Sequence, residues 1–363
     1  MSSEPSKQQQ GPVLLDRIVK SESQRVAVLG LHAHAGTRTV LASLIRELHR
    51  RQWPFAVTSA PRTPLEHEVD VQATTRLALP VGAILATAGI SGREGEAGVE
   101  LIEMTDLETS RGPVGIYRVV EGGEVDVQGP DDPDAMDALL KRLGTVSGGL
   151  VFVDGSWERR AFAAPGITDG LVLALAAGLS ATPERSAAAV RFLVEMFTVE
   201  PCDEAARLAW EETASGGAAV LLDERGRPLG LLPPGLADPV QALRGPDGTA
   251  VATVVLPHGL NDEFMVSLVR SQLRCQLVVR DATRINIAPI YFKAWFKGGG
   301  KIRVVRRTHL VGVATNPINN SGPDADAAKF RQSVAEALPG LPVHDVVLET
   351  GDEPRKPIWK FWE

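Results

Sequence analysis

The sequence predicts an α/β protein of two domains. The chain has 363 residues, 44% of them hydrophobic, which at roughly 100–200 residues per domain is enough for about two cores. Short apolar runs alternate with helical patterns in both halves, as in sheets that are at least partly parallel. Small residues gather at 213–217, where we expect a domain boundary. The expected divisions are a mobile N-terminal tail (1–21), a first α/β domain (22–215), a second α/β domain (216–350) and a C-terminal tail (351–363).

Composition excludes several classes of protein. The formal net charge is −7 and charged residues make up 23% of the chain, which argues against extensive disorder and against a nucleic-acid-binding protein. Two cysteines, Cys202 and Cys275, cannot build a disulfide framework or a four-sulfur metal site, which fits a reducing compartment. The first 24 residues lack an apolar core of signal-peptide length, and no run approaches the ~18 apolar residues of a spanning helix. We therefore expect a cytoplasmic protein that binds neither membranes nor nucleic acid.

The first domain begins with a strand, a loop, a helix and a second strand. Arg25–Gly30 is an apolar run typical of a buried strand. Thr37–Gln52 places its aliphatic residues on one helical face and most of its charged residues on the other. Phe55–Thr58 is the next apolar run. This order predicts a βαβ unit and therefore parallel strands.

The rest of the first domain follows the same kind of pattern. Apolar runs predict strands at Ala83–Ala88, Val114–Val120, Val125–Gln128 and Leu150–Val153. Helices are predicted at Asp134–Leu143, Thr168–Leu179 and Pro183–Phe197. Thr168 would be the N-cap of its helix, and Asp169 would interact favourably with the helix dipole.

The second domain is predicted to alternate again. The expected strands are Ala218–Leu222, Ala250–Leu256, Leu277–Val279, Arg284–Ala288, a pair within Lys301–Ala314, and Val343–Leu348. The expected helices are Asp262–Leu273, residues 289–296 and Ala327–Leu338. Asp281 and Thr283 fall in a turn between strands, and Thr315-Asn316-Pro317 forms a structured turn.

The loop after the first strand has the layout of a phosphate-binding loop, in which backbone N–H groups and a helix N-terminus face phosphate oxygens. The loop GLHAHAGTRT, with Gly30 and Gly36, resembles the longer loop of dethiobiotin synthetase and its relatives. On this alignment Thr37 replaces the lysine that neutralises the β- and γ-phosphates. Arg38 replaces the hydroxyl residue that binds Mg²⁺, and Thr39 follows it. The sequence thus predicts a degenerate P-loop NTPase-like domain; the alternative is an inherited strand–helix turn that binds no nucleotide.

A carboxylate at the end of a later strand completes the candidate nucleotide site. Asp154 ends the apolar run of LVFVDGS, as does the acidic residue that reaches Mg²⁺ in P-loop proteins. The alternative is that Asp154 only ends a strand and starts a turn. The candidate nucleotide-binding residues are Gly30, Gly36, Thr37, Arg38, Thr39 and Asp154.

Other constellations are weaker. His32 and His34 form an H-x-H pair, but no further zinc ligands lie nearby in the sequence, so we expect no metal site. Ser59, Arg62 and Asp70 follow the second strand, at the sheet edge where ligands of such folds gather, and Arg62 would meet a phosphate there; we favour the alternative, a surface loop. The aromatic stretch 291–296 is expected to be core or a partner-facing patch. A local basic strip follows it: Lys297, Lys301, Arg303, Arg306 and Arg307.

The combined pattern resembles a known family. The segments that carry the resemblance are, in order, AVTSAPR, GAILATA, VGIYRVVEGGEVDVQGP, GLVFVDGSWERRAFAAPGITDGLVLALAAGLS, VVRDATRINI and VGVATNP. They resemble the reactivase subunit that accompanies lysine 5,6-aminomutase and ornithine 4,5-aminomutase in amino-acid-fermenting bacteria, where it is the partner of a MutS-like ATPase. The resemblance runs from about residue 25 to residue 348.

This resemblance implies a chaperone-like role. Such a reactivase opens an adenosylcobalamin- and pyridoxal-phosphate-dependent aminomutase and lets damaged cobalamin exchange, driven by nucleotide. ATP and Mg²⁺ would be the cofactors, and the partners would be the MutS-like ATPase subunit and the aminomutase. Because Thr37 stands where the family has a lysine, we expect no independent catalysis and an energy source in the ATPase partner. The rival prediction is an ATP-dependent ligase or kinase-like enzyme related to dethiobiotin synthetase.

Overall fold

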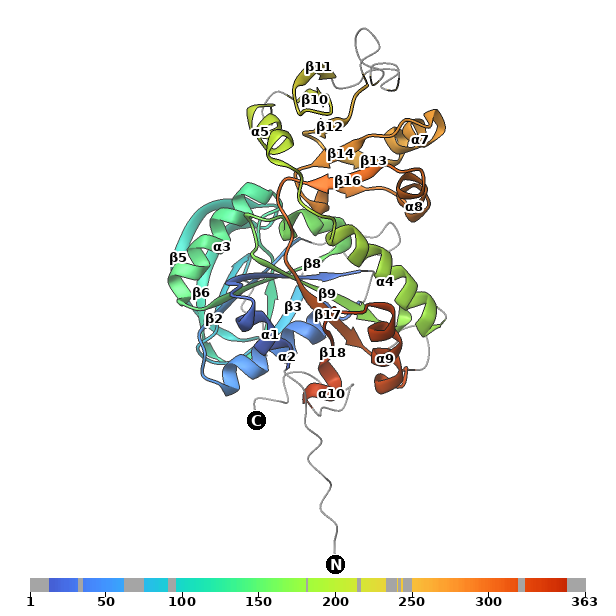
Figure 1. Cartoon of the computed structure of the whole chain (residues 1–363). Coiled ribbons are helices and arrows are strands. Elements are labelled where there is room, and N and C mark those ends of the chain that lie inside the picture. The colour runs from blue at the N-terminus through green and yellow to red at the C-terminus, as the bar shows by residue number, and fades with distance from the viewer. Residues whose placement is uncertain are drawn as a thin grey trace, which may run out of the picture. The chain divides into compact units, whose positions relative to one another are not determined.

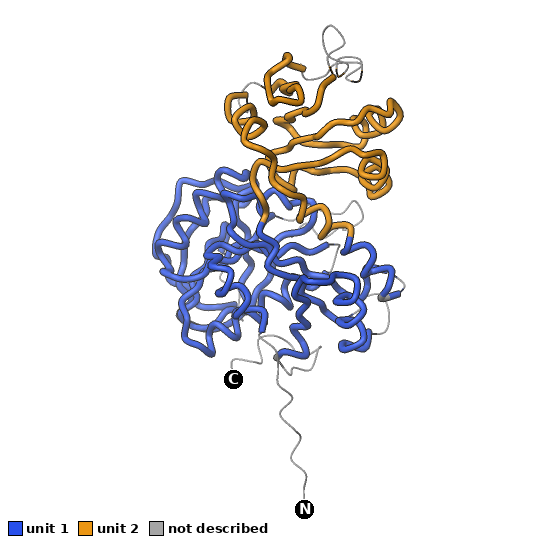
Figure 2. The backbone as a smooth tube through the Cα atoms, in the orientation of Figure 1, with its two compact units in different colours: residues 1–191, 309–363 blue, residues 192–308 orange. Residues whose placement is uncertain are grey.

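The computed structural model describes residues 13–31, 35–61, 75–90, 96–180, 182–213, 217–232, 240, 243, 250–318 and 324–350. The chain divides into two compact units, residues 1–191 with 309–363 and residues 192–308 (Figure 1, Figure 2). Both units mix helices and strands, so the predicted α/β class is confirmed. Among these described residues, none of the helices has the length and apolar character needed to cross a membrane.

A large, mostly parallel sheet forms the centre of the first unit. Its nine strands, counted within the described residues, run from edge to edge as β18 (Val343–Asp345), β17 (Leu310–Asn316), β9 (Gly170–Ala176), β1 (Arg25–Gly30), β8 (Leu150–Ser156), β2 (Phe55–Ser59), β4 (Ile84–Ala88), β6 (Gly112–Glu121) and β5 (Gly98–Thr109). The strands from β18 to β4 are parallel to their neighbours, while β6 pairs antiparallel with both β4 and β5. β3 (Thr75–Leu79) and β7 (Gly123–Val127) form a separate antiparallel pair.

Helices cover both faces of this sheet. Phe152 packs in one core cluster with α2 (Thr37–Arg50), while its neighbour Val151 faces Gly144 of α3 (Pro133–Ser147). Because successive side chains of a strand point to opposite faces, α2 and α3 lie on opposite faces. The other helical elements of this unit are α1 (Leu14–Lys20), η1 (Trp157–Ala163), η2 (Ala177–Leu179), α9 (Ala327–Ala337) and α10 (Val346–Thr350). α4 (Pro183–Phe197) contributes residues to both units.

The second unit is built around a smaller sheet. Within the described residues it has five strands, β11 (Pro228–Leu232), β10 (Ala219–Leu222), β12 (Thr253–Leu256), β14 (Gln276–Val279) and β16 (Lys301–Val304). The last three are parallel and are joined through α7 (Asp262–Ser271) and α8 (Pro289–Lys297), which is a βαβαβ arrangement. α5 (Glu204–Thr213) packs against β10 and β12, and the short elements are β13 (Leu260–Asn261), η4 (Ala282–Arg284) and β15 (Ile285–Asn286).

Most of the predicted elements are confirmed, but the strand expected at Val343–Leu348 ends at Asp345, where α10 begins, and Thr168–Leu179 is not a helix. Gly170–Ala176 forms β9, which lies between β1 and β17 and is buried at every position. Thr168 is therefore not an N-cap; its hydroxyl donates to the Phe162 carbonyl, 3.2 Å away. A central parallel strand is covered on both faces and needs no polar side, so its apolar run has no strand-like alternation.

The units also divide the chain differently from the boundary expected near residue 215. The predicted strand pair within Lys301–Ala314 is in fact two strands of different sheets, since β16 pairs with β14 and β17 pairs with β9. The segment from β17 to α10 thus belongs to the first unit, and the second unit is inserted between β9 and β17. The tail expected over 1–21 also needs correction, because Leu14, Leu15 and Ile18 of α1 are buried in the core. Residues 351–363 lie outside the described residues.

Candidate functional site

Two neighbouring parallel strands bring the candidate loop and the candidate carboxylate to the same edge of the sheet. In the register of β1 and β8, Gly30 is opposite Ser156 and Val28 is opposite Asp154. The carboxyl ends of parallel strands meet at one edge, which is where open α/β sheets bind ligands. The strand order therefore places Gly30 and Asp154 on neighbouring strands at the same edge of the sheet.

The described part of the loop is tightly held. Leu31 and Ala35 are buried, and the Leu31 N–H donates to the Ala174 carbonyl of β9 at 3.2 Å. Gly36 has φ of 86°, in the left-handed region, and directly precedes α2. A Cβ at this position would lie 2.4 Å from Nδ2 of Asn316. Only glycine fits here, because both the conformation and the space exclude a side chain. His32 and His34 lie outside the described residues.

The first turn of α2 presents Thr37, Arg38 and Thr39. Arg38 is exposed, and Thr37 and Thr39 are half-buried. The turn contains no acidic residue, so its N–H groups and the positive end of the helix dipole face no local carboxylate from the helix itself. The described residues thus place a left-handed glycine directly before a helix N-terminus, and the position aligned with the lysine holds Thr37.

Asp154 lies at the head of a buried chain of hydroxyl groups. Its carboxylate is 2% exposed, and Oδ2 accepts from the Thr75 hydroxyl at 3.3 Å. Ser59 in turn donates to the Thr75 hydroxyl at 2.7 Å, and the Ala60 N–H donates to the Asp154 carbonyl at 2.8 Å. Mg²⁺ is coordinated in proteins by oxygen atoms such as those of carboxylates and hydroxyl groups. The oxygens of Asp154, Thr75 and Ser59 are therefore of the kind that can coordinate a Mg²⁺ ion bound to a phosphate.

Sequence reasoning found part of this cluster. Ser59 was expected at the ligand-binding edge, and the structure brings it to Asp154; Arg62 and Asp70 fall outside the described residues. Thr75 had no signal, because it begins β3, a strand that the sequence did not predict. The turn expected at Thr315-Asn316-Pro317 is not found, because Thr315 and Asn316 are the last residues of β17; Asn316 Oδ1 accepts from the Ile318 N–H at 3.2 Å. The sequence did not predict that the Asn316 side chain packs against Gly36, because Asn316 was assigned to the second domain.

A second buried carboxylate, that of Asp345, lies at the end of β18. Oδ1 accepts from the N–H groups of Val347 and Leu348, each at 3.0 Å, and Oδ2 accepts from the Thr315 hydroxyl at 3.1 Å. Asp345 is fully buried, and desolvation raises the pKa of its carboxyl above the ordinary value of 3.8. The carboxylate thus fixes the start of α10 to β17.

We expect this buried carboxyl to give the protein a defined pH dependence. Since its folded pKa is raised, the folded state holds the proton more tightly, and the resulting stability is present at acidic pH and lost as pH rises. Asp345→Asn cannot ionise, so the free energy of unfolding of the wild type minus that of the variant should fall from about pH 4 to pH 7. Urea unfolding at several pH values measures this difference, with Asp326→Asn, an exposed N-cap of α9, as control. A difference that is flat or rises with pH would contradict the prediction.

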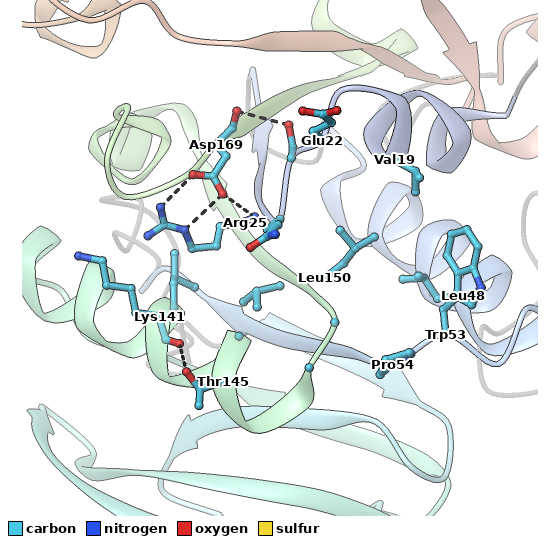
Figure 3. A pocket seen from close by; sticks show the side chains of 17 residues that line it. Val19, Glu22, Arg25, Leu48, Trp53, Pro54, Lys141, Thr145, Leu150 and Asp169 are labelled. Atoms are coloured by element: carbon cyan, nitrogen blue, oxygen red, sulfur yellow. Dashed lines mark hydrogen bonds and ion pairs between the residues drawn. The ribbon is translucent and has the colours of Figure 1, made fainter.

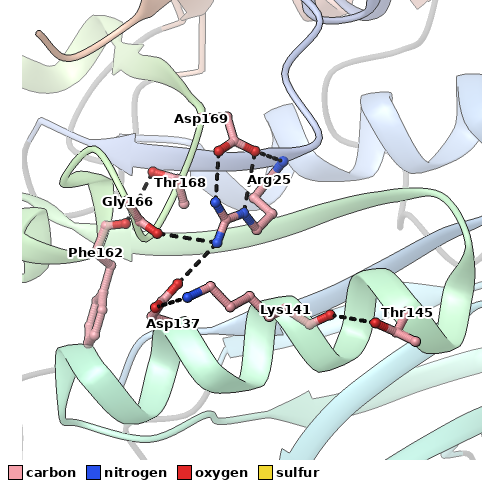
Figure 4. A network of polar contacts seen from close by, with 8 residues as sticks. All are labelled: Arg25, Asp137, Lys141, Thr145, Phe162, Gly166, Thr168 and Asp169. Carbon is pink, nitrogen blue, oxygen red and sulfur yellow. Dashed lines mark hydrogen bonds and ion pairs between the residues drawn. The ribbon is translucent and has the colours of Figure 1, made fainter.

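A cavity of about 1230 Å³ opens at the opposite edge of the sheet, where the strands begin (Figure 3). Arg25 at the start of β1 donates through Nε and Nη2 to the two Asp169 oxygens, and through Nη1 to Asp137 at 3.0 Å (Figure 4). Lys141 pairs with the other oxygen of Asp137. Both cations named here, Arg25 and Lys141, are paired with carboxylates, so the described lining of this cavity offers no unpaired cation to a phosphate. Asp169 was expected to act on a helix dipole; it instead anchors Arg25.

Other reactive groups are accounted for structurally. Asp281 is fully buried, pairs with Arg280 and caps η4 through the Thr283 N–H, as expected of a turn. Burial raises the pKa of the Cys275 thiol to about 12 and, to a smaller degree, that of Cys202, so neither supplies a thiolate at neutral pH. In the part of the chain that the structure describes, no three His, Cys, Asp or Glu residues are grouped as metal ligands.

The comparisons with known proteins leave the site to be interpreted from its own geometry: no protein-family model, no curated protein and no solved structure matches the chain.

Proposed function

We propose that the protein is an accessory, chaperone-like subunit that helps a cobalamin-dependent aminomutase to exchange damaged cofactor. The link to lysine 5,6-aminomutase or ornithine 4,5-aminomutase rests on the six sequence segments quoted above, several of which form strands of the large sheet. AVTSAPR covers most of β2, GAILATA includes β4, and VGVATNP covers most of β17. The ATP-hydrolysing partner in this proposal is a MutS-like ATPase.

One observation carries the proposal that this subunit descends from a nucleotide-binding protein. Gly30, the left-handed Gly36 and the first turn of α2 lie beside the strand that ends in the buried Asp154. This is the layout of a phosphate-binding loop with its acidic metal ligand. With Thr37 at the lysine position, the loop lacks the cation that would hold the β- and γ-phosphates. That combination favours a subunit that keeps the scaffold and leaves hydrolysis to its partner.

A reconstitution measures the proposed role directly. A purified aminomutase of either kind is loaded with hydroxocobalamin, and recovery of activity with adenosylcobalamin is followed with the MutS-like ATPase and ATP, with and without this protein. We expect recovery only when both proteins are present. Recovery at the same rate without this protein would refute the accessory role. ATP turnover by this protein alone would favour the ligase or kinase-like alternative.

Restoring the lysine should restore nucleotide binding. In isothermal titration with ATP and Mg²⁺, Thr37→Lys is expected to bind at least about tenfold more tightly than the wild type, because one charge-assisted contact contributes about 1.5–3 kcal/mol. Thr39→Lys is the matched control, since it adds the same charge in the same turn without occupying the lysine position. Equal gains in both variants, or no gain in Thr37→Lys, would show that the loop is not a phosphate-binding loop.

A further inference from the structure

The second unit contains a segment with an excess of positive charge, although the chain as a whole has a negative net charge. The net charge of the protein is −7, yet residues 264–308 contain a single acidic residue, Asp281. The same segment contains the following basic residues: Arg270, Arg274, Arg280, Arg284, Lys293, Lys297, Lys301, Arg303, Arg306 and Arg307. Such a local excess is a feature of a surface that meets an acidic partner.

Some of these cations are already engaged within the unit. Arg280 pairs with Asp281, Arg303 pairs with Glu200, and the Arg306 guanidinium lies 6.0 Å from the centre of the Trp210 ring. The others that concern us are exposed and form no ion pair among the described residues: Arg270, Arg274, Lys293, Lys297, Lys301 and Arg307. Charge available for a partner is therefore found on α7, on α8 and at the start of β16.

A groove lies between these two helices. α7 and α8 pack side by side, and a cavity of about 480 Å³ opens between their C-terminal halves. The groove is lined by Leu268, Val269 and Leu273 on the α7 side and by Ala294, Trp295 and Gly298 on the α8 side. Arg274 also lines it and lies against Gly299. Aliphatic side chains, the Gln272 amide and the Arg274 guanidinium thus line one groove.

The apolar surface extends beyond the groove along α8. Ile290 is 69% exposed, although it is a large aliphatic residue, and it lies one helical turn before Ala294 on the same face. Phe296 is 39% exposed. Lys293 and Lys297 lie between and beyond these residues on the same exposed helix. A surface of this length and character fits the apolar face of a helix, since anchors at i, i+3 and i+4 follow such a groove.

We propose that the α7–α8 groove binds a helical segment of a partner protein that inserts aliphatic side chains between the helices and places Glu or Asp residues beside Arg274, Lys297 and Lys301. Of the aromatic rings of α8, Phe292 and Trp295 are buried, while Phe296 is 39% exposed. The groove itself is lined by aliphatic side chains of α7, which match the side chains of a helix and not the stacked faces of bases. The groove therefore favours a protein segment over a nucleic acid. This assignment is independent of the nucleotide loop and of the aminomutase.

The test uses the full-length protein and a defined probe. A fluorescein-labelled peptide of about 20 residues, long enough to form a helix, carries a stripe of leucines with glutamates on the flanks. Fluorescence anisotropy should show saturable binding that weakens with salt. A peptide with the leucines replaced by serine should bind at least about tenfold more weakly, because the aliphatic anchors carry the affinity of such sites. Equal binding of both peptides would overturn the proposal.

Variants of the protein locate the binding surface. Arg274→Glu with Lys297→Glu should weaken peptide binding about tenfold or more, because like charges would then face each other. Lys329→Glu with Arg331→Glu, on the exposed side of α9, makes the same charge change elsewhere and should alter affinity less than about twofold. Ala294→Leu fills the groove without changing charge and should also weaken binding. Equal loss in the α9 variant, or tighter binding of single-stranded oligothymidine that displaces the peptide, would refute the groove.

Discussion

Gly36→Ala is expected to lower the free energy of unfolding by about 2–4 kcal/mol, the sum of two separate costs. The φ of 86° places an alanine in the left-handed region, and its Cβ would meet Nδ2 of Asn316 at 2.4 Å and Cβ of Asn316 at 3.0 Å. Asn316 is 4% exposed and its Oδ1 is held by the Ile318 N–H, so it has little freedom to move aside. Urea unfolding followed by circular dichroism measures the loss.

A second glycine separates the two costs. Gly82 has φ of 91°, but a Cβ there has no atom within 4 Å. Gly82→Ala should therefore show only the conformational cost, about 1–2 kcal/mol. Asn316→Ala in the Gly36→Ala background should recover part of the difference by removing the clashing amide. If Gly36→Ala and Gly82→Ala are equally destabilised, Asn316 does not constrain the loop as described.

Asp169→Ala is expected to cost roughly 1–3 kcal/mol, less than the loss of a fully buried pair because the carboxylate is partly exposed. Asp169 accepts from the Arg25 backbone N–H at 3.0 Å, from Nε at 3.3 Å and from Nη2 at 2.9 Å. The side chain of Arg25 is only 19% exposed, so the variant leaves a largely buried guanidinium with fewer acceptors. Thermal and urea unfolding both report the change.

Two further variants show whether the pair itself matters. Lys141→Ala removes a cation that is 62% exposed from the same network, and should cost less than about 1 kcal/mol. In a double-mutant cycle, Arg25→Ala and Asp169→Ala should couple by about 1 kcal/mol or more. If the effects of the two substitutions on the free energy of unfolding are additive, the Arg25–Asp169 pair does not stabilise the start of β1.

The elements with a clear local period were predictable from the sequence. Arg25–Gly30 is a strand with the expected bounds, and Thr37–Gln52 is a helix that ends two residues early, at Arg50. Gly170–Ala176 was misassigned because its leucines and alanines have high helix propensity, while its burial on both sides depends on β1 and β17. No local pattern could indicate that second neighbour, because β17 is more than a hundred residues away in the chain.

In the candidate site, too, residues brought together from distant segments could not be predicted from the sequence. Gly30 and Gly36 are recognisable because a strand, small residues and a helix follow in order, and Asp154 ends an apolar run. Asn316 and Thr75 reach the same edge only through the pairing of distant segments. The Arg25–Asp169 pair was also beyond sequence reasoning, since either residue alone has the character of an ordinary surface charge.

The insertion of the second unit between β9 and β17 has a consequence for the nascent chain on the ribosome. β9 ends at Ala176 and β17 begins at Leu310, so at 5–20 residues per second the neighbour of β9 is synthesised roughly 7–27 s later. During that time the apolar edge of β9 has no partner strand and can template mispairing with another chain. The inserted unit can fold within the same interval, because small domains fold in seconds or less. Ribosome-bound intermediates in which β17 has not yet emerged from the ribosome should therefore need protection by a chaperone, and released full-length chains should not.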